Sequence, residues 1–381
     1  MPTRAGWSVL GAVVALGAGG LVLDWVDLLV VAAACAAALV VGFAWVQRRP
    51  RLGVDVSLAP ARVTVGDAAD ATATVTNRGR LPSLGIDAEI PYGPAVLEVR
   101  IPRLGAGETG TVQVGLPTRR RGVVDVGPLA LVRRDPFGLF RRDEALGPAE
   151  RLWVHPRRYD LAVKSAGRTH DLDAPSADRS PAGTITFHTI REYVEGDDLR
   201  FVHWRSTART GTLMVRQNVD TSRPSTTVIL DTSAASYTPA SFEVAVEAAA
   251  SVVDACTAAG FPARVLTTHA EVSGTTRDVA PLTAHLDFLA AVSVSTTPPD
   301  PGLLAAAAPG VSGAAVVFVV GALDEAAKTA MAQVRRRYDR ATIVDVAAEV
   351  GAGAGAFITD ATYLAAPSGP AFAAGWNRAA R

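Results

Sequence analysis

The chain has 381 residues, of which 49% are hydrophobic and 19% charged, and its formal net charge at pH 7 is zero. A chain of this length is predicted to bury substantial cores in two or three domains, and its neutral charge balance gives no support for a nucleic-acid partner. The two cysteines, Cys35 and Cys256, fall in a predicted membrane helix and a predicted soluble helix. We therefore expect no disulfide between them, and neither has a neighbour at metal-ligand spacing.

Two apolar stretches open the sequence, over residues 6–23 and 28–46, with two aspartates in the connection between them. Each approaches the roughly 20 residues that a helix needs to cross a bilayer. Residues 1–50 are therefore predicted to form a transmembrane helical hairpin. A signal peptide is the rival interpretation of the first stretch, but the second stretch would still anchor the protein.

The charges that flank the hairpin predict its orientation. Arginines precede the first stretch and follow the second, at Arg4, Arg48, Arg49 and Arg51. Because cytoplasmic flanks carry an excess of Lys and Arg, both ends of the hairpin are expected in the cytoplasm. We expect a multi-pass protein of the cell membrane with its soluble domains on the cytoplasmic side.

Short alternating segments fill most of residues 51–160. About seven strands are predicted, separated by turn residues, over 54–58, 62–65, 71–76, 85–90, 96–101, 109–116 and 123–131. This spacing favours an all-β, immunoglobulin-like sandwich without its disulfide. The turn over residues 135–140 carries two phenylalanines, for which packing between domains is favoured over binding of a partner.

Residues 161–223 are predicted to hold a long irregular loop, over 166–183, and then the densest charged and aromatic stretch of the chain, over 191–216. A helix is expected from about Asp198 to Arg209, ended by Gly211. Arginines and carboxylates alternate along this stretch, so they can form bidentate ion pairs. We favour an ion-pair network that fixes a domain junction, with a ligand or catalytic site as the alternative.

This stretch resembles the signature of a bacterial family, domain of unknown function 58 (DUF58). The matching residues are Arg191, Tyr193, Gly196, Asp197, Arg200, Trp204, Ala208, Arg209 and Leu213, with Asp198 in the same network. Arg121-Gly122 and the segment over 135–140 extend the resemblance toward the N-terminus. Two positions depart from the family pattern, because His203 and Thr186 stand where acidic residues are usual.

Strand and helix patterns alternate over residues 224–381, which predicts a parallel sheet covered on both faces. The predicted strands lie over 226–230, 263–266, 314–320 and 341–346, and the predicted helices over 241–259, 283–291 and 324–338. The family resemblance, with Asp231-Thr232-Ser233 after the first strand, implies a von Willebrand factor A-like α/β domain. That fold carries an Asp-x-Ser-x-Ser magnesium site, here with Ala235 in place of the second serine. Thr267 or Thr268 and Asp324 are candidates for further oxygen ligands. A degenerate, metal-free site is favoured, with bound Mg²⁺ as the alternative.

No catalytic residue is predicted, because no nucleophile stands in a recognisable motif. We expect a membrane-anchored cytoplasmic scaffold or adaptor that is not an enzyme, and the resemblance implies a MoxR-type AAA+ ATPase as its partner. Two alternatives stay open. One is a Mg²⁺-dependent protein-binding module that uses Asp231 and Ser233. The other is a hydrolase or transferase that uses Asp197, Asp198, His203 and the neighbouring arginines.

Overall fold

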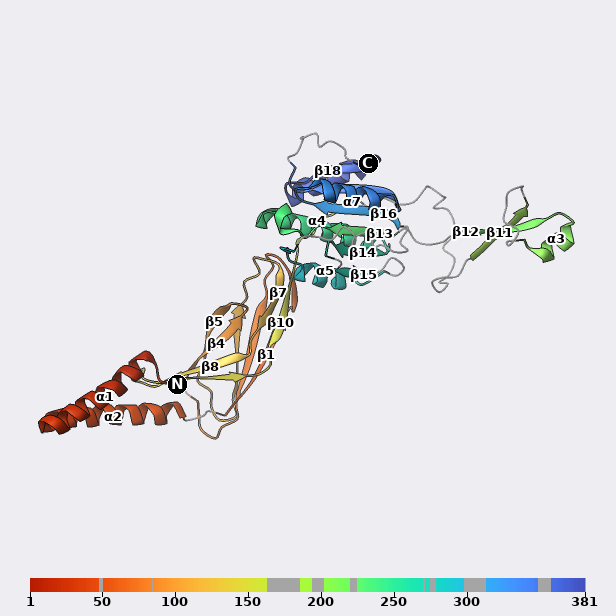
Figure 1. The fold of residues 1–381 in the computed structure, drawn as a ribbon. Coiled ribbons are helices and arrows are strands. Elements are labelled where there is room, and N and C mark those ends of the chain that lie inside the picture. Colours follow the sequence, from red (N-terminus) through yellow and green to blue (C-terminus); the bar gives the residue numbers. More distant parts are fainter. Residues whose placement is uncertain are drawn as a thin grey trace. The chain divides into compact units, whose positions relative to one another are not determined.

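The structure is a computed structural model that describes residues 1–47, 51–83, 85–162, 186–193, 202–219, 225–269, 271–274, 279–297, 313–348 and 358–380. The chain divides into two compact units, Met1–His155 and Pro156–Arg381, and each is described by itself (Figure 1). The first unit holds two long apolar helices and a β-sheet region, and the second holds an α/β body. This is a multidomain layout.

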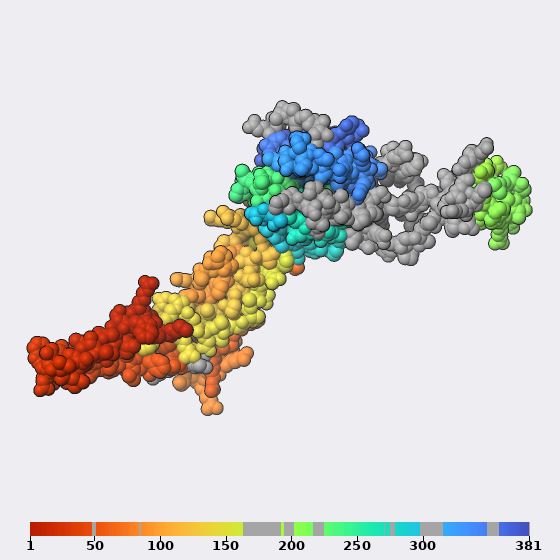
Figure 2. Space-filling model, viewed as in Figure 1, coloured from red at the N-terminus to blue at the C-terminus, as the bar shows by residue number. Residues whose placement is uncertain are grey.

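The first unit begins with helices α1 (Arg4–Leu23) and α2 (Val26–Gln47). Thr3 caps α1 by accepting a hydrogen bond from the Gly6 backbone, and Asp24 ends it in the left-handed conformation at φ 56°. The two helices then pack closely, because Gly20 lies directly against Leu29. Both are long and apolar enough to cross a membrane, and most of their surface is exposed (Figure 2).

Ten strands follow in the first unit: β1 (Leu52–Ala59), β2 (Arg62–Thr64), β3 (Asp70–Asn77), β4 (Ile86–Tyr92), β5 (Ala95–Ile101), β6 (Thr109–Gly115), β7 (Gly122–Val126), β8 (Leu129–Arg134), β9 (Arg141–Leu146) and β10 (Glu150–His155). They form one sheet in the order β1-β3-β6 and a second in the order β2-β10-β7-β4-β8-β9, with β5 beside β4. Alternate residues of both sheets, such as Ala73 and Ile90, share one buried core. This arrangement follows the period of two along each strand.

The structure corrects two details of the predicted strands. The single strand expected over 123–131 is two strands, because Gly127 takes φ 88° and Pro128 cannot donate to a ladder. Strands β9 and β10 were not predicted. Strand β9 carries Arg141, Arg142, Asp143 and Glu144, which hide the apolar alternation of a strand.

The helical hairpin is fixed to the sheet region through the turn between β8 and β9, which we call the Asp135 turn (residues 135–140). The Thr3 backbone N–H and hydroxyl donate to the Leu139 and Gly138 carbonyls at 2.8 and 2.7 Å. The ring of Phe140 packs edge-on against Phe43 of α2, with centroids 5.8 Å apart. Residues of the hairpin and of the turn therefore form one packed junction, in which Phe140 is packed and Phe137 is exposed.

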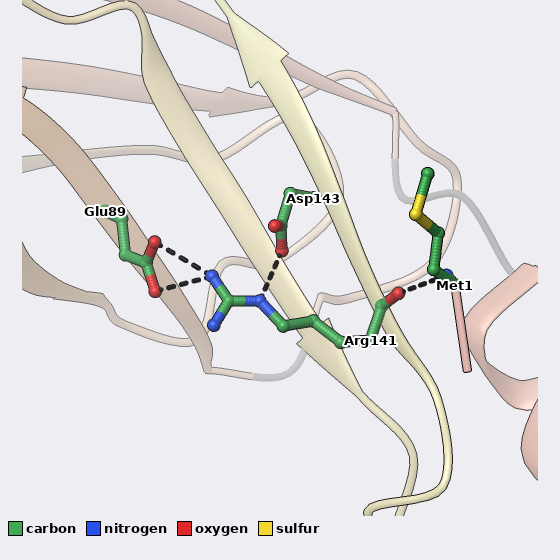
Figure 3. A network of polar contacts seen from close by, with 4 residues as sticks. All are labelled: Met1, Glu89, Arg141 and Asp143. Carbon is green, nitrogen blue, oxygen red and sulfur yellow. Dashed lines mark hydrogen bonds and ion pairs between the residues drawn. The ribbon is translucent and has the colours of Figure 1, made fainter. Parts of the chain in front are cut away.

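Backbone and charged contacts extend this junction along β9 (Figure 3). The Met1 carbonyl accepts from the Arg141 backbone N–H at 2.9 Å. The Arg141 guanidinium donates to both oxygens of Glu89 at 2.9 Å and to Asp143 at 2.9 Å. The hydrogen bond to Asp143 is the main cause that raises the pKa of Arg141 above its ordinary value.

The second unit begins with a small module of two antiparallel strands and a short helix, β11 (Thr186–Glu192), α3 (Trp204–Thr210) and β12 (Met214–Val219). The helix starts at Trp204 and not at Asp198, because Val202 forms a bridge with Val215 and His203 caps the helix. Gly211 ends it at φ 74°, as predicted. No residue of α3 is buried.

The body of the second unit is a six-stranded sheet in the order β15-β14-β13-β16-β17-β18. Its elements are β13 (Thr226–Leu230), η2 (Ala234–Ser236), α4 (Pro239–Ala258), β14 (Ala263–Thr267), β15 (Val272–Gly274), α5 (Leu282–Ala291), β16 (Gly313–Val320), α7 (Glu325–Arg335), β17 (Tyr338–Asp345), β18 (Ala361–Ala365) and α8 (Gly369–Ala380). All strands but the edge strand β15 are parallel.

Helices cover both faces of this sheet, as the strand-helix alternation predicts. Residues of α4, α5 and α8 share one core with Val228 and Leu230, and residues of α7 share a second core with Ile229 and Phe318. Strand β17 begins at Tyr338, which was predicted to end the preceding helix. Strands β15 and β18 and helix α8 were not predicted.

Residues 156–162 run along the body of the second unit. Arg158 forms an ion pair with Asp254 at 3.2 Å, and the Tyr159 backbone N–H donates to Ser251 of α4 at 3.0 Å. The Trp376 indole of α8 donates to the Ala162 carbonyl at 3.0 Å. The compact unit therefore starts at Pro156, a few residues before the predicted domain boundary at 160/161.

Candidate binding site at the carboxyl edge of the parallel sheet

A cavity of about 430 Å³ opens at the edge of the sheet where the parallel strands end, beside helix α7. We call it the edge cavity. Apolar residues from β13, β16 and α7 form most of its wall, among them Ile229, Phe318 and Met331. The polar lining comes from different loops that the parallel topology brings together: Asp231, Ser233, Ser236, Thr268 and Asp324. Carboxyl ends of parallel strands are where ligands bind in open α/β sheets.

Asp231 is the buried carboxylate of this cavity, with 7% of its surface exposed. Its Oδ1 accepts the Ser233 backbone N–H at 3.0 Å and the Thr268 hydroxyl at 3.2 Å. Among the residues that the structure describes, none donates to its Oδ2. A carboxylate oxygen is thus available at a cavity wall that is otherwise mostly apolar.

Hydrogen bonds hold the loop after β13 from two sides. The Thr232 hydroxyl lies 2.7 Å from His269 Nδ1, and His269 Nε2 lies 2.9 Å from the Thr297 carbonyl. Because a carbonyl only accepts, Nε2 donates to Thr297. The Ser295 backbone N–H also donates to the Thr232 carbonyl at 2.7 Å. Thr232 itself is 2% exposed, so its hydroxyl positions the loop.

Gly321 follows β16 and lies between Val320 and Ala322, two residues that line the cavity. A Cβ at this residue would lie 2.1 Å from the Ser236 carbonyl oxygen, and the Ala322 backbone N–H donates to that same oxygen at 2.9 Å. The neighbouring Tyr237 is packed beside Asp231 and Asp345. Burial is the main cause that raises the pKa of Tyr237 well above its ordinary value, and the two carboxylates add to the effect.

The structure brings together several of the predicted metal-site residues. Asp231, Ser233, Thr268 and Asp324 all line the edge cavity, and Ala235 lies in the same wall. Asp324 also caps α7, since its Oδ1 accepts the Ala327 backbone N–H at 2.7 Å. Within the described part of the chain, no group of three or more His, Cys, Asp or Glu side chains could hold a metal. The donors here are one buried carboxylate, hydroxyls and a capping carboxylate.

The signature residues divide between described and undescribed parts of the chain. Gly196, Asp197, Asp198 and Arg200 lie outside the described residues, as do Glu195 and the loop over 166–183. The backbone of Arg191 pairs with Val215 and the Tyr193 N–H donates to the Leu213 carbonyl at 2.8 Å. These contacts tie the beginning and end of the signature together.

The helix of the module presents its side chains to solvent. Trp204 is 70% exposed, and Ala208, Arg205 and Arg209 are exposed as well. The ring of His203 is engaged, since its Nδ1 accepts the Ser206 backbone N–H at 3.2 Å and lies 2.8 Å from the Ser206 hydroxyl. The ion-pair network stays a prediction for the members outside the described residues, and so does the alternative of a catalytic Asp197–Asp198–His203 cluster.

Sequence reasoning missed Thr232, His269, Ser295 and Thr297. They lie up to 65 residues from one another, from 232 to 297, and carry no short motif. The hydroxyl of Thr232 between two predicted ligands was the available signal. The other contacts depend on the parallel topology, which brings the ends of β13 and β14 together.

These features describe a membrane-associated, multidomain protein with two N-terminal apolar helices, a β-sheet region and a C-terminal α/β unit. Residues 189–273 match the family model "Protein of unknown function DUF58". This is the family that the signature predicted. No curated protein matches the chain.

Solved structures resemble only part of the chain. The CARDB domain of a Pyrococcus furiosus protein, solved with di-metal ions, is 15% identical over 28% of this chain and 93% of its own, with a TM-score of 0.22. The alkylpurine DNA glycosylase AlkC of Pseudomonas fluorescens is 16% identical over 29% of this chain and 32% of its own, with a TM-score of 0.22. A β-glucosidase from Listeria innocua is 15% identical over 28% of this chain and 16% of its own, with a TM-score of 0.18.

Proposed function

We propose that this DUF58 protein is a membrane-anchored scaffold that binds a protein partner and does not catalyse a reaction. The carrying observation is the Oδ2 atom of the buried Asp231 at the wall of the edge cavity, while its Oδ1 is held by Ser233 and Thr268. A preformed cavity with few convergent polar groups is typical of a binding site. The Thr232 hydroxyl lies beside His269, as a nucleophile lies beside its base, but it is buried and already hydrogen-bonded. This favours binding over catalysis.

In this proposal the chain has four parts: a hairpin that crosses the cell membrane twice (1–50), an immunoglobulin-like sandwich (51–160), the signature segment (161–223) and a von Willebrand factor A-like domain (224–381). Two sheets around one core support the second assignment. A parallel sheet with helices on both faces and Asp231-Thr232-Ser233 at its carboxyl edge supports the fourth.

The soluble parts are proposed to lie in the cytoplasm. The start of α1 and the last turns of α2 both contact the Asp135 turn, so both of these helix ends lie on the same side as the sandwich. Arg4 and Arg51 flank these ends. The positive-inside rule places such arginines in the cytoplasm.

The proposed partner is a MoxR-type AAA+ ATPase, which the family resemblance suggests. The exposed Trp204, with Arg205 and Arg209 on the same short helix, supplies the kind of aromatic and guanidinium surface that is enriched at binding hot spots. The signature segment would then contact the partner as well as bracing the junction of two domains.

A capture experiment with purified components tests this proposal. The full chain in lipid nanodiscs is mixed with the purified MoxR-type ATPase of the same cell, and Trp204→Ala is compared with Val272→Ala, which truncates another exposed apolar side chain of the α/β unit to alanine. We expect Trp204→Ala to weaken capture about tenfold or more and Val272→Ala to leave it unchanged. No capture by the unmodified chain would refute the partner, and equal capture by both variants would refute the role of the signature.

A Mg²⁺-dependent binding module is the second candidate, and it is favoured because every polar side chain that lines the edge cavity offers oxygen atoms. Asp231 Oδ2, Ser233 and Thr268 would hold the ion, and hard oxygen donors suit Mg²⁺. Ala235 supplies a methyl group where the family pattern has a hydroxyl, so water would complete the octahedron. Titration calorimetry with MgCl₂ is expected to show heat for the native chain and none for Asp231→Asn. Equal traces for both would remove this candidate.

A further inference from the structure

The tip of the Asp135 turn carries an exposed aromatic ring beside the helical hairpin. Phe137 is 57% exposed, while the residue two positions later, Leu139, is 6% exposed. Asp135 builds the tip, because its Oδ2 accepts the Phe137 N–H at 3.0 Å and its Oδ1 accepts the Phe140 N–H at 2.6 Å. Both oxygens of Asp135 thus hold the backbone of the turn, while the side chain of Phe137 stays exposed outside the buried core.

The position of this turn along the helices places it within the apolar span. Helix α2 has 22 residues, about 33 Å at 1.5 Å per residue, close to the roughly 30 Å of a hydrocarbon core. A Cβ on Gly42 would lie 2.9 Å from the Asp135 carboxylate, and Gly42 precedes the end of α2 at Gln47 by five residues. The turn therefore contacts α2 about 7.5 Å before the end of the helix, on the way toward its middle.

Other exposed aromatic rings lie at the same end of the hairpin. Trp7 is 61% exposed in the first turn of α1, and Phe43 and Trp45 are 53% and 44% exposed near the end of α2. Arg134 is exposed at the base of the turn, and the Arg142 side chain donates to Gln47, the last residue of α2. Aromatic rings with neighbouring basic groups are typical of a membrane–water interface.

The geometry points to a third membrane contact of this protein: the Asp135 turn inserts Phe137 into the headgroup–acyl boundary of the bilayer, with Arg134 and Arg142 at the level of the lipid phosphates. The occupant of this surface is phospholipid, because the exposed ring continues the apolar surface of α1 and α2. The sandwich would then contact the bilayer directly, besides being linked to it. This inference rests on the proposed membrane anchoring by the hairpin.

Spin labelling of the full chain in phospholipid vesicles tests the inference. In a Cys35→Ala, Cys256→Ala background, single cysteines replace Phe137, Val96 and Val14, all of which are exposed. Val96 pairs with Pro91 at the end of β4 and β5 farthest from the Asp135 turn, so it is the aqueous control. Val14 lies in the middle of α1 and is the lipid control. The collision rates of each label with oxygen and with a water-soluble nickel complex are compared.

We expect the oxygen-to-nickel ratio at residue 137 to exceed that at residue 96 several-fold and to approach that at residue 14. A ratio at 137 equal to that at 96, with residue 14 in lipid, would overturn the insertion and leave the anchor intact. Protection of residue 137 from both reagents would also overturn it, because a protein surface would then cover the ring. A water-exposed residue 14 would refute the anchor and the insertion together.

Discussion

Two buried aspartates in different units of the protein use the same local device for different purposes. Asp135 and Asp231 each accept the backbone N–H of the residue two positions later, at 3.0 Å in both cases. At Asp135 the second oxygen is also engaged, by the Phe140 N–H. At Asp231 the second oxygen is at the wall of the edge cavity. A satisfied carboxylate builds structure, whereas a half-satisfied one leaves an acceptor for a ligand.

The surroundings differ in the same sense. The Asp135 turn is enclosed by backbone contacts, because Gly6 and Gly42 let both helices approach it closely. The Asp231 loop is held by hydrogen bonds from Thr268, His269 and Ser295, while Asp231 and Ser233 line the cavity. Burial alone does not distinguish a structural aspartate from a binding one, and the partners of each oxygen do.

The largest loss of stability is expected when a side chain is added at a glycine where a helix packs against the Asp135 turn. A Cβ on Gly6 would lie 2.2 Å from the Leu139 carbonyl oxygen, whereas one on Gly11 would meet nothing within 4 Å. Gly6→Ala should therefore destabilise the first unit by about 3 kcal/mol through overpacking, and Gly11→Ala should not. Thermal unfolding of the full chain in detergent measures both, and equal melting temperatures would contradict the junction.

The two aspartates can be compared directly by replacing each with asparagine. Asp135 accepts from two backbone N–H groups, and in Asp135→Asn the NH₂ group, which cannot accept, would face one of them. This change should cost about 2 kcal/mol of stability. Asp231→Asn keeps an oxygen for Ser233 and Thr268, so we expect a loss below about 1 kcal/mol. Chemical denaturation measures both losses. A larger loss at residue 231 would reverse the assignment of the two roles.

The second unit should lose stability in mild acid because of His285. This side chain is fully buried, its Nδ1 lies 3.1 Å from the Ser273 hydroxyl, and burial lowers its pKa below the ordinary value. The unfolded chain therefore binds the proton more readily, so this contribution to stability is complete above about pH 6.5 and decreases as the pH falls toward the folded-state pKa. Melting temperatures from pH 8 to pH 5 measure it.

His285→Asn is the matched variant for this effect, because an amide keeps an acceptor near Ser273 but does not titrate. Its stability should be lower at neutral pH and should depend less on pH over the same interval. A pH dependence as steep as that of the native chain would assign the acid sensitivity to other groups.

The smallest effect is expected at the charged network of Figure 3. The Arg141 side chain is 36% exposed, and its partner Asp143 is 51% exposed, so solvent screens the pairs. Arg141→Gln should cost about 0.5 kcal/mol, and 1 M salt should remove much of the difference from the native chain. A loss of several kcal/mol would mean that these charges, and not the close backbone contacts, hold the junction.

The amino-acid sequence predicts those helices and strands whose apolar residues recur with the period of the element. The apolar helices, most strands of the sandwich and the strand-helix alternation of the second unit follow from such patterns. Strand β9 escapes because Arg141 to Glu144 are charged, and α8 escapes because its sequence is rich in glycine and alanine. Helix α3 is shorter than predicted because the ring of His203 caps it. The sequence does not reveal this cap, since histidine is also compatible with a position inside a helix.

The candidate site is predictable only in part for a similar reason. Asp231 and Ser233 follow a buried strand, and parallel topology makes a strand end a natural place for ligands. The Oδ1 atom of Asp231 is bound by Thr268, 37 residues away, and Thr232 is bound by His269 at the same separation. Such contacts arise from the fold as a whole and leave no local pattern.

The connection between α1 and α2 consists of Asp24 and Trp25 alone. In a hairpin that crosses the bilayer, these two residues are all that the far side of the membrane can touch between the helices. With the proposed cytoplasmic orientation, a soluble signal outside the cell would find almost no surface to recognise there. Any information that this hairpin passes inward must then come from the lipids around it or from helices of neighbouring proteins within the membrane.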